Sequence, residues 1–318
     1  MTQFIGAGAA DATRPGAFVY RGPEDDPDLS LTVGLLLESS SYNFNVSYVA
    51  PDDITEESLK TIKVFAFPGG EDVDSSWEEL EPVADRIRDF VSQGGRYLGF
   101  CLGAYLAGDS PGLALLPKGS KISAESDEPD AQVKDDRDTV IQVNWEFSSG
   151  PEAGKTVMNR WVYYQEGNLI KDFPETSTSL VIGRYSTTNH VAATINKYGN
   201  GWVGTTGPHP EANQTWFDLE KLTAPDGLQF EIGHDLIEAT MSGGHNVKNL
   251  AVPKPGDGTD GTNPPSGGNG NNGTTGDNGN SGNNNGNPGN NGTSASPKAV
   301  ESSGSRRMKN PLRFFFRR

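Results

Sequence analysis

The sequence contains a single cysteine, Cys101, and only four histidines. One cysteine excludes an internal disulfide framework and suits a reducing compartment. No apolar run approaches the roughly 20 residues that span a bilayer, and residues 1–16 lack the basic and apolar regions of a secretory signal. These absences predict a cytoplasmic protein.

Basic residues are also scarce, with 26 Lys and Arg against 42 Asp and Glu, for a formal net charge of −16. An acidic body repels nucleic acid and anionic membranes, so we expect no nucleic-acid partner for the folded part. Residues 298–318 are the exception, because they mix seven basic residues and several aromatic ones with one acid. Three interpretations of this tail stay open: docking to a partner or an anionic membrane, a localisation signal, or contact with the acidic body.

Apolar side chains are almost missing from residues 256–293, which include 13 glycines and 12 asparagines. Such a segment cannot form a packed core. The composition therefore predicts a flexible N-terminus (1–15), one folded domain (16–250), a disordered Gly/Asn-rich linker (251–297) and a basic-aromatic tail (298–318).

The first hundred residues alternate apolar strands with amphipathic helices. We expect strands at 17–21, 44–49, 63–67 and just before Cys101, and helices at 29–39 and 77–93. Ser76 and Glu79 form a capping-box pattern before the second helix, and Gly94 follows it. Strands separated by helices predict an α/β fold with a mostly parallel, doubly wound sheet, which binds ligands at the carboxyl ends of its strands.

After residue 108 the pattern changes to strands joined by Gly, Asp and Asn turns. We expect antiparallel strands at 139–147, 156–164, 179–185 and 190–197, inserted before a final strand at 201–206. The acidic segment 125–138 has two interpretations: a solvated loop, which charge runs usually are, or a flap beside the site.

Cys101 lies where a buried strand turns into a helix, between Gly99 and Gly103. Small residues at these positions allow the sharp turn that exposes a nucleophile above a sheet edge. The N-terminus of the helix would also favour the thiolate. A buried structural thiol is the alternative for a lone cysteine.

A thiol nucleophile needs a base, and His209 is the best candidate because Pro208 and Pro210 fix its backbone and Glu211 follows two residues later. Glu211 can orient one imidazole nitrogen while the other faces the thiol. The Pro-Gly-Gly turn after strand 63–67 adds backbone amides at Gly69 and Gly70. Together with the amide of Leu102, they can form an oxyanion hole.

The order of these segments, Phe-Pro-Gly-Gly, then Gly-x-Cys-x-Gly, then His-Pro-Glu, resembles the class I glutamine amidotransferase-like superfamily. The likeness is nearest to the N-terminal domain of biotin-protein ligases, over about residues 16–242. The resemblance implies a flavodoxin-like fold and a Cys101–His209–Glu211 triad. No segment resembles the Gly-Arg-Gly-Arg motif that binds biotinyl-adenylate, so the chain is not itself a biotin ligase.

One departure concerns the substrate. Amidotransferases that hydrolyse glutamine usually continue the elbow with a glutamine where this chain has Tyr105. Tyr105 and Tyr164 are candidate substrate-binding residues, with core packing as the alternative. The sequence predicts no metal or cofactor. It favours amide or ester hydrolysis or acyl transfer on a small substrate, and leaves open a non-catalytic ligand-binding or regulatory module and a redox-sensing thiol.

Overall fold

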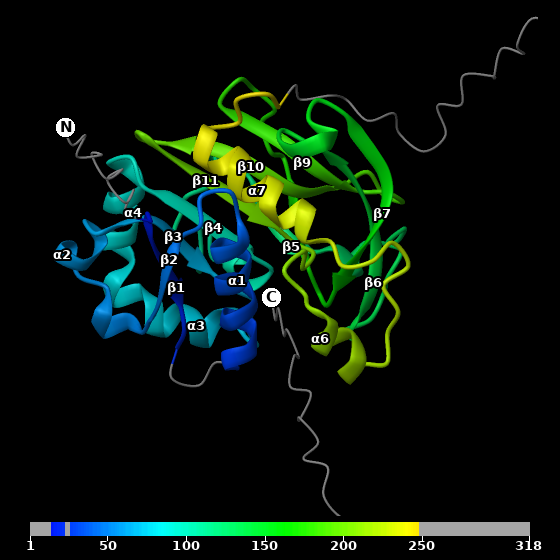
Figure 1. Cartoon of the computed structure of the whole chain (residues 1–318), viewed down its shortest axis with the longest axis horizontal. Helices are drawn as coiled ribbons and strands as arrows, with labels where there is room; N and C mark the ends of the chain where they lie inside the picture. The colour runs from blue at the N-terminus through cyan, green and yellow to red at the C-terminus, as the bar shows by residue number, and fades with distance from the viewer. Residues whose placement is uncertain (1–13, 23–25, 248–318) are drawn as a thin grey trace, which may run out of the picture. The chain divides into compact units, whose positions relative to one another are not determined.

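A computed structural model describes residues 14–22 and 26–247 (Figure 1). The strands are β1 (Gly16–Tyr20), β2 (Asn45–Val49), β3 (Ile62–Phe67), β4 (Arg96–Phe100), β5 (Lys121–Ala124), β6 (Thr139–Glu146), β7 (Thr156–Tyr164), β8 (Asn168–Lys171), β9 (Ser179–Tyr185), β10 (Val191–Tyr198) and β11 (Gly201–Thr206). The α-helices are α1 (Pro27–Ser39), α2 (Glu56–Leu59), α3 (Val73–Leu80), α4 (Ala84–Ser92), α5 (Leu102–Tyr105), α6 (Gln214–Leu219) and α7 (Phe230–Ser242).

The strands form one 11-stranded sheet with the order β2-β1-β3-β4-β11-β10-β9-β6-β7, to which β5 and β8 attach beside β10. Strands β2, β1, β3, β4 and β11 are parallel, and the others pair antiparallel. The mixed α/β fold is as expected, but the antiparallel part is larger than an insertion. It continues the sheet, because β11 pairs parallel with β4 on one side and antiparallel with β10 on the other. A two-residue turn at Gly199 and Asn200 connects β10 to β11.

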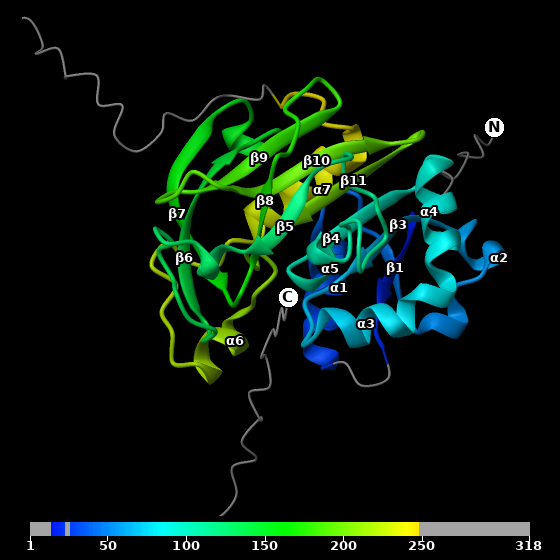
Figure 2. The same ribbon diagram turned by 180° about the vertical axis from the view of Figure 1, so that it is seen from behind.

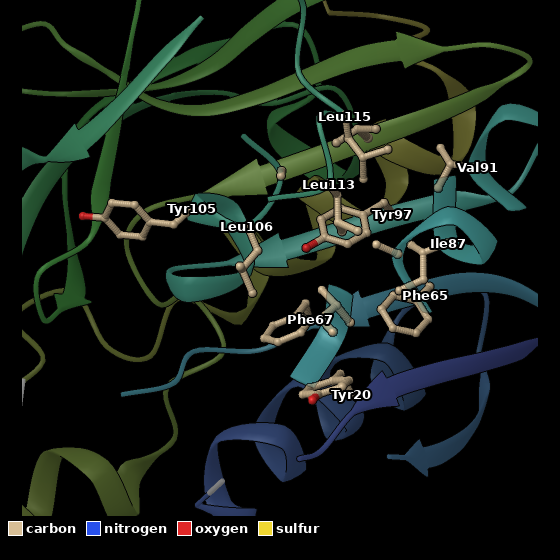
Figure 3. Packing of buried hydrophobic residues seen from close by; sticks show 14 of the residues in the cluster. Tyr20, Phe65, Phe67, Ile87, Val91, Tyr97, Tyr105, Leu106, Leu113 and Leu115 are labelled. Carbon is tan, nitrogen blue, oxygen red and sulfur yellow. The ribbon is translucent and has the colours of Figure 1, made fainter. Parts of the chain in front are cut away.

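Helices cover both faces of the parallel strands. Figures 1 and 2 show α1 and α7 over one face and α3 and α4 over the other. Alternate side chains of β3 separate accordingly: Val64 and Ala66 pack with α1 and α7, whereas Phe65 and Phe67 pack with α3 and α4. Both clusters are buried, and Figure 3 draws the cluster that contains Phe65 and Phe67. The parallel half is thus a two-sided sheet whose strand ends are fixed by two hydrophobic cores.

The expected single helix at 77–93 is wrong in its start and its continuity. Helix α3 begins at Val73, because Asp72 caps it by accepting a hydrogen bond from the Ser75 amide at 2.8 Å. The helix is then interrupted by a 3₁₀ turn at Glu81–Val83 before α4 begins. Pro82 explains the break, because proline lacks the amide hydrogen that an α-helix interior needs.

Strands β5 and β8 and helix α6 were not expected. Most of the acidic segment is exposed, as in a solvated loop, but its first residue is not. Glu125 is fully buried while most of its acidic neighbours are exposed. The predicted flexible N-terminus, apart from residues 14 and 15, and the linker and tail lie outside the described residues.

Candidate active site

Cys101 follows β4 and precedes α5, at the carboxyl edge of the sheet. Its backbone has φ 47° and ψ −103°, a conformation that costs energy for any residue with a Cβ. The surrounding turn has no room for side chains, because a Cβ on Gly103 would lie 2.2 Å from the carbonyl oxygen of Phe67. The amide of Cys101 donates to the carbonyl of Thr206 at 2.8 Å, so β11 holds the elbow in place.

The expected contribution of a helix N-terminus is small. Helix α5 has only four residues, and the field of so short a helix is weak. Any activation of the thiol must therefore come mainly from neighbouring side chains.

His209 supplies such a neighbour. It follows β11, the strand next to β4, and its amide donates to the carbonyl of Tyr163 at 2.9 Å. Its Nδ1 lies 2.8 Å from Glu211 Oε1, and both side chains are at least 95 % buried. Trp216 and Tyr163 place their rings against the imidazole at centroid distances of 5.5 and 6.2 Å. The imidazole is therefore fixed on three sides.

The electrostatics of His209 are dominated by opposing effects. Burial lowers its pKa, whereas the charges of Glu211 and Cys101, and hydrogen bonds to both, raise it. The result is a pKa well above the usual 6.5, so the imidazolium is favoured beside the sulfur. His209 thus lies close enough to Cys101 and Glu211 for both charges to act on its imidazole.

The Pro-Gly-Gly turn lies against both groups. A Cβ added to Gly69 would be 2.9 Å from His209 Cε1 and 3.9 Å from Cys101 Cβ, and one on Gly70 would be 2.3 Å from Leu102 Cδ2. The amide of Gly103 donates to Pro68 at 3.1 Å and joins this turn to the elbow. Across residues 14–22 and 26–247, no protein group accepts a hydrogen bond from the amides of Gly69, Gly70 or Leu102.

A turn at residues 165–167 covers the thiol. Cys101 is 9 % exposed, and its Sγ donates to the carbonyl oxygen of Gln165 at 3.6 Å. Glu166 has φ 44°, and its carbonyl accepts a hydrogen bond from the Tyr105 hydroxyl at 3.0 Å. Figure 3 shows Tyr105 at the margin of its cluster with the hydroxyl turned away from Phe65 and Tyr97. Tyr105 therefore fastens the covering turn.

Tyr164, the other candidate for substrate binding, is fully buried, and its hydroxyl donates to the carbonyl of Gly167 at 3.2 Å. Nearby, the buried Glu125 accepts from Thr188 at 2.7 Å and contacts His190 Nδ1 at 2.9 Å. His190 therefore forms a second histidine–carboxylate pair, for which its sequence context gave no signal.

A cavity of about 370 Å³ lies at the other edge of the sheet, near the amino ends of β3 and β4. Lys60, Lys63 and Arg86 are among its lining residues, and Cys101 is not. In the part of the chain that the structure describes, no group of His, Cys, Asp or Glu could hold a metal ion. Nor is any helix there long and apolar enough to cross a membrane.

Sequence reasoning missed the groups that surround the pair. Trp216, on α6, packs its ring against His209, and Glu166, in the turn after β7, accepts a hydrogen bond from Tyr105. Their contacts link residues far apart in the sequence, so no local pattern could place them.

These features define a mixed α/β protein with a strained cysteine elbow next to a buried histidine–carboxylate pair. Residues 17–116 match the family described as biotin-protein ligase, N terminal, which confirms the resemblance stated from the sequence for that segment. The segment includes the Pro-Gly-Gly turn and Cys101, and it ends before His209. No curated protein matches the chain significantly.

Solved structures similar to this chain include a glutamine amidotransferase from Thermotoga maritima, with 14 % identity, a TM-score of 0.44, and coverage of 72 % of this chain and 98 % of that one. A ThuA-like protein from Bacteroides uniformis has 13 % identity and a TM-score of 0.43, with 74 % and 94 % covered. A cytoplasmic protein from Salmonella typhimurium has 10 % identity and a TM-score of 0.44, with 70 % and 99 % covered.

Proposed function

We propose that this protein is a cysteine-dependent hydrolase or acyl transferase of class I glutamine amidotransferase-like design, acting on an amide or ester of a small substrate. Cys101 is the nucleophile, His209 the general base and acid, and Glu211 the group that orients His209. The amides of Gly69, Gly70 and Leu102 donate hydrogen bonds to the developing oxyanion.

In the first half-reaction the Cys101 thiolate attacks the carbonyl carbon, and the carbonyl π electrons move onto oxygen. The three backbone amides stabilise that oxyanion. As the C=O bond re-forms, the C–N or C–O bond breaks and His209 gives its proton to the leaving amine or alcohol. An acyl-thioester on Cys101 remains.

In the second half-reaction water, or another nucleophile in a transferase, attacks the thioester. His209 takes the proton of the attacking group, the C–S bond breaks, and the Cys101 thiolate is restored beside the imidazolium. Throughout, the Glu211 carboxylate holds Nδ1–H at 2.8 Å and so keeps the other imidazole nitrogen for the reaction.

The observation that carries the proposal is the buried His209–Glu211 contact next to Cys101, together with the raised pKa of His209. Both members of this pair are buried, unlike His190 in the second histidine–carboxylate pair, and burying both groups costs their desolvation. The pair has a chemical use if a thiolate stands on the other side of the ring.

The test is the pH dependence of Cys101 alkylation by iodoacetamide in the parent protein and in His209→Ala. We expect fast alkylation of the parent near neutral pH. The variant should need a pH above about 8, and should react about 100-fold more slowly at pH 6.5, because an ordinary thiol has a pKa of about 8.5. His234→Ala is the matched control, since His234 contacts Ser39 on α1 instead of the site.

Equal and slow alkylation of parent and His209→Ala would refute the thiolate–imidazolium pair. That result would favour the second candidate function, a ligand-binding module without turnover. The observation on its side is the covered thiol, which is 9 % exposed beneath the Gln165 carbonyl.

A further inference from the structure

The side chain of Asn168 is buried without a partner. Asn168 is the first residue of β8, directly after the turn that covers Cys101, and it is 0 % exposed. Within the described residues, neither its Nδ2 nor its Oδ1 forms a hydrogen bond. Its backbone is well placed by contrast, because its carbonyl accepts from the Tyr185 hydroxyl at 2.7 Å.

An unpaired amide in a protein interior is costly. Leaving a buried donor or acceptor without a hydrogen bond costs about 1–3 kcal/mol, and Asn168 has one of each kind. A leucine would fill a similar volume without that cost. The carboxamide therefore needs a partner that offers both an acceptor and a donor.

The register of β8 shows which way the side chain faces. Asn168 pairs with Ala124 and Ile170 pairs with Ile122, so these four residues share one face of the β5–β8 pair. Ile122 lies against Gly108, and Ile170 belongs to the cluster that contains Tyr105. This face is therefore turned toward α5, the helix that begins directly after Cys101.

The backbone of Asn168 lies near two segments that contact or carry Cys101 and His209. Asn168 comes three positions after Gln165, whose carbonyl accepts a hydrogen bond from Cys101 Sγ. The Cα atoms of Asn168 and Gln165 are therefore at most about 10 Å apart. On the other side, a Cβ on Gly207 would lie 2.2 Å from the carbonyl oxygen of Asn168, and Gly207 is two residues before His209. The free carboxamide thus lies on the face of β8 turned toward α5, in a strand that directly follows the turn covering Cys101.

The charges nearby decide between ligand types. Glu125, which is buried, directly follows β5, and Glu166, which is half-buried, lies two residues before β8. A carboxylate ligand would meet like charge in a poorly solvated space. A neutral amide offers the complementary donor and acceptor without that repulsion.

We propose that Asn168 is a substrate-binding residue that hydrogen-bonds a neutral amide group of the substrate, a few bonds away from the carbonyl that Cys101 attacks. This inference rests on the proposed function and adds the class of substrate: acyl compounds with a second, non-reacting amide.

The experiment uses chloromethyl ketones Cl–CH₂–CO–(CH₂)ₙ–CONH₂ of increasing chain length, each compared with the analogue that ends in CH(CH₃)₂. Alkylation forms the S–C bond of Cys101 and releases chloride. Saturation kinetics separate the binding constant KI from the maximal rate. In the parent we expect a KI about tenfold lower for the carboxamide at one chain length, the range of one or two hydrogen bonds.

In Asn168→Leu that preference should disappear, so that the KI of the carboxamide rises to about that of its CH(CH₃)₂ analogue. Asn196→Leu is the matched control, because Asn196 is also buried but uses its Nδ2 to donate to Leu115. It should lower the thermal midpoint and retain the preference. No preference in the parent at any chain length, or a preference that survives in Asn168→Leu, overturns the proposal. If Asn168→Leu raises the thermal midpoint but keeps the preference for the carboxamide, the Asn168 side chain binds only water, and the proposal is also overturned.

The variant Cys101→Ser separates a failure of the proposed function from a failure of the role proposed for Asn168. In this variant the chlorine-free methyl ketones are titrated while the side-chain ¹⁵N–¹H₂ signals of Asn168 are followed by NMR. Shifts with the carboxamide and none with the CH(CH₃)₂ analogue support the role of Asn168 even if Cys101 is unreactive. Absence of shifts with both overturns it.

Discussion

The hydroxyl of Tyr105 donates a hydrogen bond to the carbonyl oxygen of Glu166, 3.0 Å away. This contact connects the helix that follows the nucleophile with the turn that covers it. An acyl group cannot reach Cys101 while the Gln165 carbonyl occupies the space above the sulfur, so the turn has to move during the proposed reaction.

Tyr105→Phe should therefore loosen the covering turn. We expect alkylation of Cys101 by a bulky maleimide to become several-fold faster, with iodoacetamide less affected because it is smaller. The loss of one buried hydrogen bond costs about 1 kcal/mol of stability. Tyr97→Phe is the control, since the Tyr97 hydroxyl donates to Gly103 on the other side of the elbow. Equal rates in parent and Tyr105→Phe would contradict the role of this contact.

Gly69→Ala should disturb the site without breaking the fold. Its Cβ would stand 2.9 Å from His209 Cε1, so the imidazole must move. A displacement of this kind is expected to slow Cys101 alkylation at neutral pH by about 10- to 100-fold. The control is Gly227→Ala, which meets no atom within 4 Å but has φ +80°. It should lose about 1 kcal/mol of stability and keep the parent alkylation rate. If Gly69→Ala alkylates Cys101 at the parent rate, the position of the imidazole does not depend on the space at Gly69.

Glu166 should make stability depend on pH. Burial, followed by the charges of Asp136 and Asp127, raises its pKa from 4.5 to about 7. Between these pH values the folded state binds more protons than the unfolded state, so stability falls as pH rises. Glu166→Gln removes that loss. Its thermal midpoint should exceed that of the parent by a few degrees at pH 8, because the group is half-exposed and screened, and by nearly nothing at pH 4.5. A constant difference across this range would rule out the titration of Glu166 as the cause.

Asp235 should be the largest single contributor to stability among the carboxylates of α7. Its Oδ1 accepts hydrogen bonds from the amides and hydroxyls of Ser148 and Ser149, and its Oδ2 accepts from Trp145 Nε1 at 2.9 Å. Asp235→Ala leaves these donors without an acceptor, which is expected to cost about 3 kcal/mol or more. Urea unfolding measures the loss.

The control for Asp235 is Asp85→Ala. Asp85 forms an exposed ion pair with Arg88, and such pairs contribute at most about 1 kcal/mol. Similar losses in the two variants would mean that the hydrogen bonds of Asp235 add little to stability.

The sequence was sufficient for those parts of the site that lie at strand ends. Cys101 and His209 each follow a strand that the sequence predicted, and adjacent parallel strands bring their ends together. It was insufficient where contacts cross the molecule. Asn168 and Glu125 look like ordinary polar residues in a turn-rich region, and their burial depends on how β5 and β8 pair.

The same distinction holds for the fold. The strand–helix alternation predicted the parallel half, because periodicity is a local property. The extent of the antiparallel half was underestimated, because short strands such as β5 and β8 carry too few residues to show alternation. Pro82 is a different case: the signal for a helix break was present, and the apolar face on both sides of it masked the interruption.

The pairing of β11 with β4 has a consequence for biosynthesis. Cys101 and His209 follow strands whose partner residues, such as Phe100 and Thr206, are about a hundred positions apart. A growing chain therefore presents its thiol long before the matching histidine has been made, and contacts of such high sequence separation form late. Under the proposed function, Cys101 therefore gains its base only after β11 has paired with β4, and incomplete chains carry the thiol without its histidine partner.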